Sequence, residues 1–236
     1  MATTPILILQ HLPEDPPGLL ATVLQEHHIT YQIVEIGKEP LPDVLPAALI
    51  VLGGPQSAYD ESLSSEKALI RRALEHNLPC LGICLGGQVL AEVCGAQIHV
   101  GTATEIGFYE LPLTDEALRD PLYEGIPGNA HLVFNWHNDA FDLPPGAVLL
   151  ETGVIAYHQA FRYGQHAYGL PYHPEVTEEM FDLWVRSHPE REKTIALLGQ
   201  ERYRQLGEVE GPRRYPLYRE QAILLFTNFL RIAGLL

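Results

Sequence analysis

The 236-residue sequence is poor in basic residues, and this shortage excludes one class of partner. Lys and Arg number 15 against 30 Asp and Glu, which gives a net charge of −15. A general binder of nucleic acid or of anionic membranes needs the opposite sign of charge. The sequence therefore predicts a small-molecule substrate, and neither nucleic acid nor membrane as a partner.

Cysteine is also scarce, and long apolar runs are absent. Cys80, Cys84 and Cys94 are the three cysteines, too few and too close together for a disulfide framework. Such sparse use of cysteine is typical of a reducing compartment. The chain shows no signal-peptide pattern at its start, and no run of about 18 apolar residues occurs in it. We therefore expect a cytoplasmic protein.

Two kinds of ligand site lack a signature as well. No phosphate-binding loop of the G-x-x-x-x-G-K-[ST] type occurs, and no His and Cys residues have the spacing of metal ligands. We expect neither a cofactor nor a metal.

The basic residues are concentrated in segment 186–219, which contains eight basic and five acidic residues. That segment fits a solvated helical face or a surface for an acidic partner.

Short apolar runs alternate with helical patterns along the chain. Strands are predicted at 6–9, 31–36, 48–52, 80–84, 106–113, 132–135, 148–151, 155–161 and 167–170. Helices are predicted at 19–27, 64–76 and 86–93, the second one capped by Ser64 or Ser65. The alternation favours an α/β fold with an open, mainly parallel or mixed sheet flanked by helices.

The chain has no linker rich enough in Pro, Gly or Ser to divide it. We therefore expect a single domain over 1–236, with a core of about 1–180 and a helical C-terminal extension of about 181–236. In that extension, apolar residues recur at helical spacing and form a candidate core face: Ala222, Leu225, Phe226, Phe229, Leu230 and Ala233.

The most informative motif is the segment L-G-I-C-L-G-G-Q around Cys84. An apolar strand meets a cysteine with glycine neighbours and continues at once as a helix, the cysteine version of the G-x-S-x-G nucleophile elbow. Glycines avoid clashes around a strained nucleophile. The helix N-terminus favours the thiolate, and the Leu85 N–H can bind an oxyanion. The alternative for Cys84 is a buried core cysteine in an ordinary βα turn. Cys80 and Cys94 lack the setting of an elbow, and we expect both in the core.

His173 is the strongest candidate for the base that such a cysteine needs. It follows the apolar and aromatic segment 167–172, and Glu175 stands two residues later in H-P-E. A carboxylate at that distance can fix the tautomer of the imidazole and stabilise the imidazolium. The order Cys84, His173, Glu175 then makes a triad, although H-P-E alone would be a simple turn.

A third element is the turn Gly53-Gly54-Pro55, which follows another buried strand. Exposed N–H groups of a Gly-Gly turn suit an oxyanion or a substrate carboxylate. In open α/β sheets, ligands bind at the carboxyl ends of the strands. Alone, the motif is equally compatible with an ordinary turn.

Together these three segments resemble the class I, triad-type glutamine amidotransferases. The resemblance also covers Cys94-Gly95-Ala96 and Trp136-His137-Asn138-Asp139, and it extends over roughly residues 1–180. Within the family, the chain is most similar to the glutaminase domain of GMP synthase and to stand-alone proteins like it. The resemblance implies a flavodoxin-like α/β sheet with a nucleophile elbow.

The family pattern also implies roles for the matching residues. Cys84 would attack the side-chain amide of glutamine and form a γ-glutamyl thioester. His173 would move the protons, and Glu175 would orient it. Gly54 and Leu85 would donate N–H groups to the oxyanion.

The remaining matches concern the pocket. Gln88 would hold the amino-acid end of the substrate, and Trp136, His137 and Asp139 would line the same pocket. GMP synthase has S-H-G-D where this sequence has W-H-N-D, so Trp136 would either reshape the pocket or close the core.

The 61 residues after Glu175 are too few for the ATP pyrophosphatase domain of GMP synthase, and its S-G-G-x-D-S loop does not occur. We therefore expect that this chain does not make GMP alone. Ammonia that it releases would go to a separate acceptor enzyme or to water.

Three functions remain open. The first is a glutaminase that feeds ammonia to a separate acceptor enzyme. The second is a γ-glutamyl peptidase or hydrolase acting on glutathione-like compounds, which the same thioester chemistry would serve and a roomy entrance near Trp136 would favour. The third is a non-catalytic binding or regulatory protein, whose signature would be the loss of Cys84, His173 or Glu175.

Overall fold

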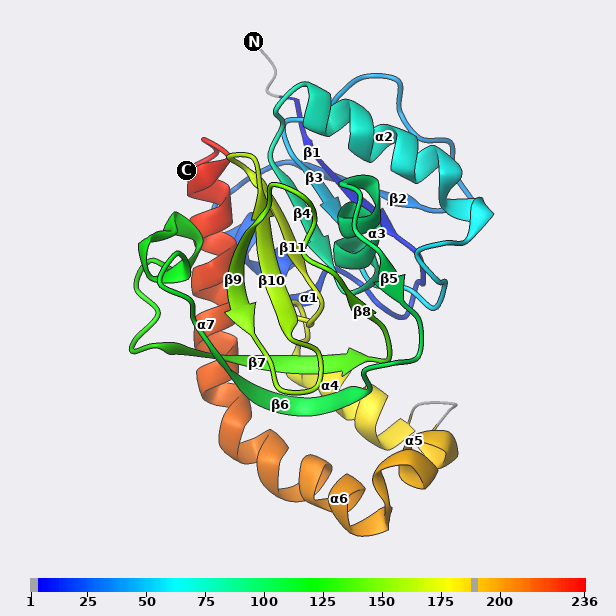
Figure 1. The fold of residues 1–236 in the computed structure, drawn as a ribbon, viewed down its shortest axis with the longest axis vertical. Helices are drawn as coiled ribbons and strands as arrows, with labels where there is room; N and C mark the ends of the chain where they lie inside the picture. The colour runs from blue at the N-terminus through cyan, green and yellow to red at the C-terminus, as the bar shows by residue number, and fades with distance from the viewer. Residues whose placement is uncertain (1–3, 188–190) are drawn as a thin grey trace.

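A seven-stranded sheet forms the centre of the protein in a computed structural model, which describes residues 4–187 and 191–236 (Figure 1). From edge to edge, the strands are β2 Tyr31–Glu35, β1 Ile6–Gln10, β3 Leu49–Val51, β4 Cys80–Ile83, β11 Ala167–Leu170, β10 His158–Tyr163 and β9 Val148–Thr152. The first five are parallel, and β10 and β9 pair antiparallel. The predicted open, mainly parallel or mixed sheet is confirmed.

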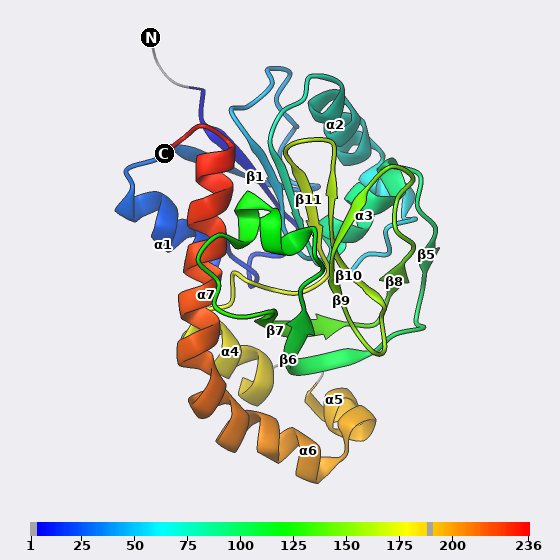
Figure 2. The ribbon, with the colours of Figure 1, turned by 60° about the vertical axis from the view of Figure 1, so that its left-hand side comes forward.

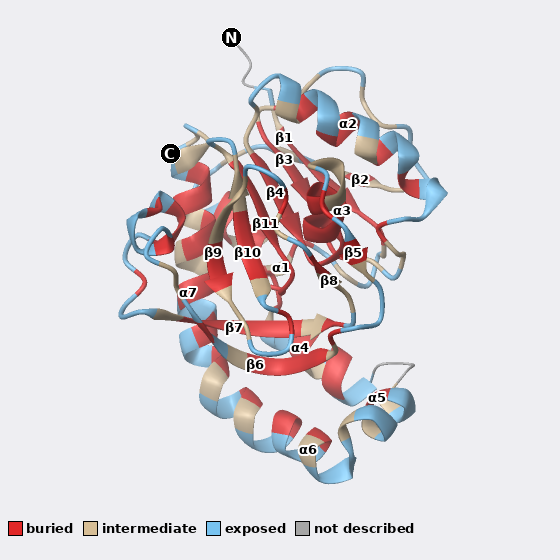
Figure 3. Cartoon of the chain, in the orientation of Figure 1, coloured by how far each residue is buried: buried red, intermediate tan, exposed pale blue. Residues whose placement is uncertain are grey.

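Helices cover both faces of this sheet (Figure 2). On one face lie α1 Gly18–Glu26 and α7 Gly211–Ile232, and on the other lie α2 Ser64–Glu75 and α3 Leu85–Val93. Alternate side chains of a strand point to opposite faces. Thus Ile6 and Ile8 pack with the first pair of helices, and Leu7 and Leu9 pack with the second. The central strands β1, β3, β4 and β11 are consequently buried along their whole length, whereas the edge strands β2 and β9 are only partly buried (Figure 3).

A hairpin crosses the carboxyl ends of the central strands (Figure 1). It consists of β6 Glu105–Pro112 and β7 Ala130–His137. A second small pair, β5 Ile98–His99 with β8 Ala140–Phe141, lies beside it. The carbonyl of Phe134 in β7 accepts the N–H of His173 at 2.9 Å, so the hairpin is fastened to the chain that leaves β11.

The C-terminal part is helical, as expected. It contains α4 Glu178–Asp182, a π-helical turn at Leu183–Ser187, α5 Arg191–Leu198, α6 Gln200–Gln205, a second π-helical turn at Leu206–Glu210, and α7. Residues 188–190 of the expected extension lie outside the described residues. The core face predicted on α7 is buried, apart from Ala233, which is partly exposed.

Many basic side chains of segment 186–219 have acidic partners close by. Arg204 pairs with Glu201 and Glu208, and Arg202 pairs with Glu210. Such pairing within one helical region is the pattern of a solvated helical face.

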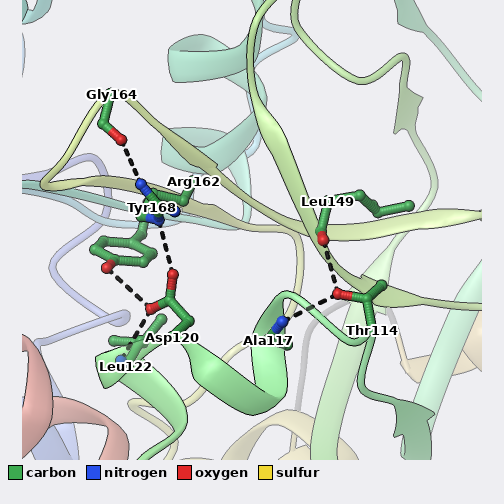
Figure 4. Close-up of polar contacts among 8 residues, drawn as sticks. All are labelled: Thr114, Ala117, Asp120, Leu122, Leu149, Arg162, Gly164 and Tyr168. Atoms are coloured by element: carbon green, nitrogen blue, oxygen red, sulfur yellow. Dashed lines mark hydrogen bonds and ion pairs between the residues drawn. The ribbon is translucent and has the colours of Figure 1, made fainter.

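The segment between the two hairpin strands is anchored to the sheet through Asp120 (Figure 4). One carboxylate oxygen accepts from Arg162 Nε at 2.7 Å, and the other accepts from Tyr168 Oη and from the Leu122 N–H, both at 3.0 Å. Thr114 adds a hydrogen bond of 2.8 Å from its hydroxyl to the Leu149 carbonyl. These contacts hold residues 114–122 against β9, β10 and β11.

Two local predictions are wrong. Neither Ser64 nor Ser65 caps α2, because a 3₁₀ turn at Glu61–Leu63 precedes the helix and begins at Asp60, whose carboxylate accepts the Ser62 N–H at 2.8 Å. The strand predicted at 155–161 begins only at His158. Its first three residues belong to a loop closed by the Gly153 N–H bond to the Tyr157 carbonyl, in which Ile155 and Tyr157 are exposed and Ala156 is buried. No helix in the described ranges is long and apolar enough to cross a membrane.

Candidate active site

Cys84 lies at a sharp turn between β4 and α3. Its backbone angles are φ 51° and ψ −112°, a conformation that is strained for a residue with a Cβ. The turn is tight: a side chain at Gly82 would overlap the Gly86 backbone, and one at Gly86 would overlap the Val51 carbonyl. The predicted elbow is therefore present, and its glycines are required by close backbone contacts.

His173 is fixed through both its backbone and its ring. Its N–H donates to the Phe134 carbonyl, and its own carbonyl accepts the Tyr218 hydroxyl at 2.6 Å. Its Nδ1 lies 2.7 Å from Glu175 Oε1, and both side chains are buried. Nδ1 is thereby occupied by the carboxylate, which leaves Nε2 for a second partner.

Cys84 and Glu175 both act on the protonation of that imidazole. Burial disfavours the charged ring, but the Cys84 sulfur and the Glu175 carboxylate outweigh it through charge and hydrogen bonding, and the pKa of His173 lies well above its ordinary value. The ring is therefore stabilised as an imidazolium beside the sulfur.

The loop that carries H-P-E is held by two helices. The Leu19 N–H at the start of α1 donates to the Glu175 carbonyl at 2.8 Å. Gly18, at φ +45°, allows this approach, because any side chain there would overlap that carbonyl. From α7, the Tyr218 hydroxyl also accepts the Val176 N–H at 3.0 Å. Helices from both ends of the chain thus fix the imidazole and its carboxylate.

The Gly53-Gly54 turn faces these groups. A Cβ added to Gly53 would lie 3.0 Å from His173 Cε1 and 3.5 Å from Cys84 Cβ, so both side chains face the same glycine. In the described part of the chain, the Gly54 N–H makes no hydrogen bond with another backbone group. Leu85 is the first residue of α3, where N–H groups lack a partner within the helix. Among the described residues, neither N–H group has a backbone partner, and both residues line the same cavity as Cys84.

A cavity of about 420 Å³ opens over Cys84. Of the nine residues proposed from the sequence, eight line it: Gly54, Cys84, Leu85, Gln88, Trp136, His137, Asp139 and His173. Glu175 stands behind His173 and reaches the cavity only through it. The structure therefore brings all nine together at the carboxyl edge of the sheet.

The W-H-N-D segment forms one wall of the cavity. His137 lies between two acceptors, with Nδ1 3.1 Å from the Asp139 carbonyl and Nε2 3.2 Å from Glu105 Oε2. Asp139 Oδ1 accepts the Gly101 N–H at 2.8 Å. Trp136 lines the cavity and also packs against the core.

Asp15 and Trp184 are two of the lining residues that were not proposed from the sequence. Asp15 comes five residues after β1, and a polar residue beyond the carboxyl end of a strand is a signal that could have found it. Trp184 belongs to the π-helical turn far from any motif. The two side chains are hydrogen-bonded to each other, and burial raises the pKa of Asp15 while the nearby His173 opposes the rise.

The cavity has acidic and aromatic walls. Asp15 and Asp139 contribute carboxylates, and Trp136 and Trp184 contribute indole rings. Of the lining residues that the structure describes, none is Lys or Arg. The other two cysteines lie outside this setting, and burial raises the pKa of both Cys80 and Cys94 to about 12.

Comparison with known proteins agrees with this architecture. A model of the family described as glutamine amidotransferase class-I matches residues 19–185. The chain belongs to this family. One curated relative is the glutamine amidotransferase-like protein YfeJ of Salmonella typhimurium. It is 36% identical to this chain over 139 residues, which cover 56% of this chain and 57% of YfeJ. The GMP synthase of Phenylobacterium zucineum is 32% identical over 167 residues, or 67% of this chain and 30% of that enzyme.

Solved structures of glutamine amidotransferases match over nearly the whole length. That of Thermotoga maritima has a TM-score of 0.84 and 27% identity, covering 99% of each chain. That of Methylobacillus flagellatus has a TM-score of 0.83 and 25% identity, covering 98% of this chain and 96% of the other. The resemblance inferred from the motifs is confirmed. The chain spans little more than half of YfeJ and under a third of the GMP synthase.

Proposed function

We propose that this family member hydrolyses the side-chain amide of glutamine through a thioester on Cys84. The observation that supports it most is the meeting of Cys84 and His173 at Gly53, with Glu175 on the far nitrogen of the imidazole. Nucleophile, base and orienting carboxylate are then in the relation that thiol-based acyl transfer needs.

In the first half of the reaction, the Cys84 thiolate attacks the amide carbon of glutamine and forms a C–S bond. The carbonyl oxygen becomes an oxyanion, and the N–H groups of Gly54 and Leu85 stabilise it. The imidazolium of His173 gives its proton to the amide nitrogen. The C–N bond breaks, ammonia leaves, and the γ-glutamyl thioester remains.

In the second half, a water molecule attacks the thioester carbon. His173, now neutral, takes one proton from this water, and the same two N–H groups stabilise the second oxyanion. The C–S bond breaks and Cys84 is released as the thiolate, while the proton taken from water restores the His173 imidazolium. The γ-carboxyl group of the product gives its remaining proton to the solvent, and glutamate leaves. Glu175 accepts the Nδ1 hydrogen throughout and keeps Nε2 turned to the reacting atoms.

The walls of the cavity have roles in substrate binding. Gln88 would hold the amino-acid end of glutamine, and Trp136, His137 and Asp139 would form the wall beside it. All four border the cavity, which supports this assignment. Because the Asp139 carboxylate is an acceptor, it suits the ammonium group of the substrate.

The released ammonia would go to a separate acceptor enzyme, as in the family in general. We place this reaction in the cytoplasm, where three free cysteines are compatible with the redox state.

We also propose that the chain acts as a single domain over 1–236. Its core of about 1–180 would depend on the C-terminal extension, because Tyr218 of α7 fastens the His173 backbone.

The second candidate is γ-glutamyl peptidase or hydrolase activity on glutathione-like compounds. The cavity volume of about 420 Å³ favours it, since a donor larger than glutamine has room to enter. The charge of the walls disfavours it, because the leaving dipeptide of glutathione carries a carboxylate and the lining offers no Lys or Arg. Glutamine, which leaves neutral ammonia, fits these walls better.

The test measures release of glutamate from glutamine and from glutathione by the purified protein. We expect turnover of glutamine, a fall of at least 10³-fold in Cys84→Ser, and full activity in Cys94→Ser, the matched control. Faster cleavage of glutathione than of glutamine would replace the first proposal with the second. Release from neither donor would favour the third candidate, a non-catalytic binding or regulatory protein.

A further inference from the structure

The Gly53–Gly54 peptide lies between two imidazoles, and each imidazole has its own glutamate. On one side stands His173 with Glu175, as described above. On the other side stands His11, whose Nδ1 lies 3.0 Å from the Gly53 carbonyl oxygen and whose Nε2 lies 3.0 Å from Glu66 Oε2. This second pair takes no part in the chemistry proposed above.

The second pair is a fixed and buried arrangement. The side chains of His11 and Glu66 are 0% and 1% exposed. A carbonyl oxygen carries no hydrogen, so the contact with Gly53 requires that His11 Nδ1 donate. Glu66 Oε2 contacts Nε2 on the opposite side of the ring. The two contacts together hold the plane of the imidazole and keep Nδ1 directed at the Gly53 carbonyl.

The ring of His11 also determines which residue can follow Gly53. A Cβ added to Gly54 would lie 2.7 Å from His11 Cβ and 2.8 Å from its Cγ. The imidazole thus lies directly against the glycine backbone. A peptide between two glycines is the least restricted in rotation, so a contact that holds it has most effect there.

The geometry of the Gly53–Gly54 peptide determines where the Gly54 N–H points. In a trans peptide, the C=O and the following N–H point in opposite directions. The Gly53 carbonyl points to His11, which does not line the cavity, whereas Gly54 does line it. Holding the carbonyl on the buried side therefore turns the Gly54 N–H toward the cavity and Cys84.

We propose that His11, oriented by Glu66, is a positioning residue that aims the Gly54 N–H at the oxyanion. This proposal rests on the proposed function, since it assigns a task within that reaction. Neither residue touches the substrate; both act through the backbone of the turn. Loss of one oxyanion donor costs about 10²- to 10³-fold in kcat, and this sets the size of the expected effect.

The test compares His11→Leu with His11→Asn. Leucine fills the space without a donor, and asparagine places an amide N–H near the position of Nδ1. We expect His11→Leu to lower kcat for glutamine about 100-fold with KM unchanged within about threefold. His11→Asn should recover at least tenfold of that loss. Alkylation of Cys84 by iodoacetamide should keep its rate in both, because the thiol and His173 are untouched.

A matched control separates positioning from stability. His131 and Glu151 form another buried pair, 2.7 Å apart, and neither lines the cavity. His131→Leu should lower the thermal midpoint as His11→Leu does but leave kcat within about threefold. If His11→Leu does not fold, Glu66→Gln provides the same comparison, with an expected loss of about tenfold in kcat and a normal alkylation rate.

The outcomes are distinguishable. Wild-type kcat in His11→Leu, an equal loss of kcat in His131→Leu, or a loss shared by the alkylation rate would each overturn the positioning role. Absence of glutamate release in the wild-type protein would overturn the proposed function itself, and the positioning role with it. A selective loss of kcat that asparagine restores would establish it.

Discussion

The indole of Trp184 stands edge-on to the imidazole of His173, with ring centroids 4.9 Å apart and planes at 86°. The same indole is hydrogen-bonded to Asp15, so it links the imidazole to a carboxylate in the cavity. Trp184 comes from the π-helical turn after α4, outside every motif that points to the chemistry. The catalytic imidazole proposed above is therefore held from the C-terminal helices as well as by Glu175.

Replacing that indole should impair turnover more than binding. Aromatic edge-to-face contacts contribute about 0.5–1.5 kcal/mol, so we expect Trp184→Leu to lower kcat for glutamine roughly threefold to tenfold. Trp184→Phe, which keeps an aromatic edge but loses the indole N–H, should lose less. Steady-state kinetics of both variants provide the measurement. An equal loss in the two would assign the effect to the Asp15 hydrogen bond instead.

Alkylation should distinguish the three cysteines. Burial raises the pKa of Cys80 and Cys94 to about 12, so at pH 8 only about 10⁻⁴ of either thiol is ionised. We expect a brief treatment with iodoacetamide to give one adduct, at Cys84, located by mass spectrometry of peptides. The Cys84→Ser protein should remain unlabelled under the same conditions. Labelling of Cys94 at the rate of Cys84 would contradict the proposed nucleophile.

The titration of His173 should follow its two partners. Its pKa in the folded protein is raised well above about 6.5 because Cys84 and Glu175 outweigh burial. Glu175→Gln and Cys84→Ser each remove one of these causes, so each should lower that pKa. The ring Cε1–H signal in an NMR titration gives the measurement, and an unmoved signal in Glu175→Gln would refute the coupling.

The same shift predicts how stability depends on pH. A raised pKa in the folded state stabilises the protein fully below the unfolded value of about 6.5, and this contribution is lost as pH rises through the folded value. The part of the free energy of unfolding that comes from His173 should therefore decrease as pH rises above 6.5. Urea unfolding of wild-type and Cys84→Ser protein across that range tests the sign, since the variant should lose less.

Asp15 should determine how the protein treats donors with an acidic leaving group. Its carboxylate lines the cavity beside His173, where it repels the carboxylate of the dipeptide that leaves glutathione. Asp15→Asn should therefore raise kcat/KM for glutathione relative to glutamine by about fivefold to tenfold. The exposed neighbour Glu14 gives a matched control, because Glu14→Gln changes the same charge outside the lining. Equal ratios in the two variants would contradict the role of Asp15.

Local sequence was sufficient to predict the site residues that belong to a recognisable sequence motif. Cys84 could be placed because a strand, a glycine-flanked residue and a helix follow one another directly, and Glu175 because only Pro174 separates it from His173. The cap of α2 was mispredicted because a 3₁₀ turn begins earlier, at Asp60. In the correct predictions and in the wrong one, residues close in the sequence determine the local structure.

Residues that act across the fold could not be predicted in this way. His11 meets Glu66 across 55 positions, and Tyr218 meets His173 across 45. No spacing rule links such partners, because only the packing of β1 against α2, or of α7 against the H-P-E loop, brings them together. The same holds for Trp184, whose turn has no periodicity that distinguishes it from a surface helix.

Tyr218 has a consequence for the order in which the protein becomes functional during synthesis. The hydroxyl that fastens the His173 backbone lies 134 residues after Cys84. At about 5 to 20 residues per second, the ribosome adds that tyrosine roughly 7 to 27 s after the cysteine. During this interval the nascent chain carries its thiol without the helix that fixes the imidazole. The nucleophile is thus made long before the apparatus that activates it, and α7 completes the site last.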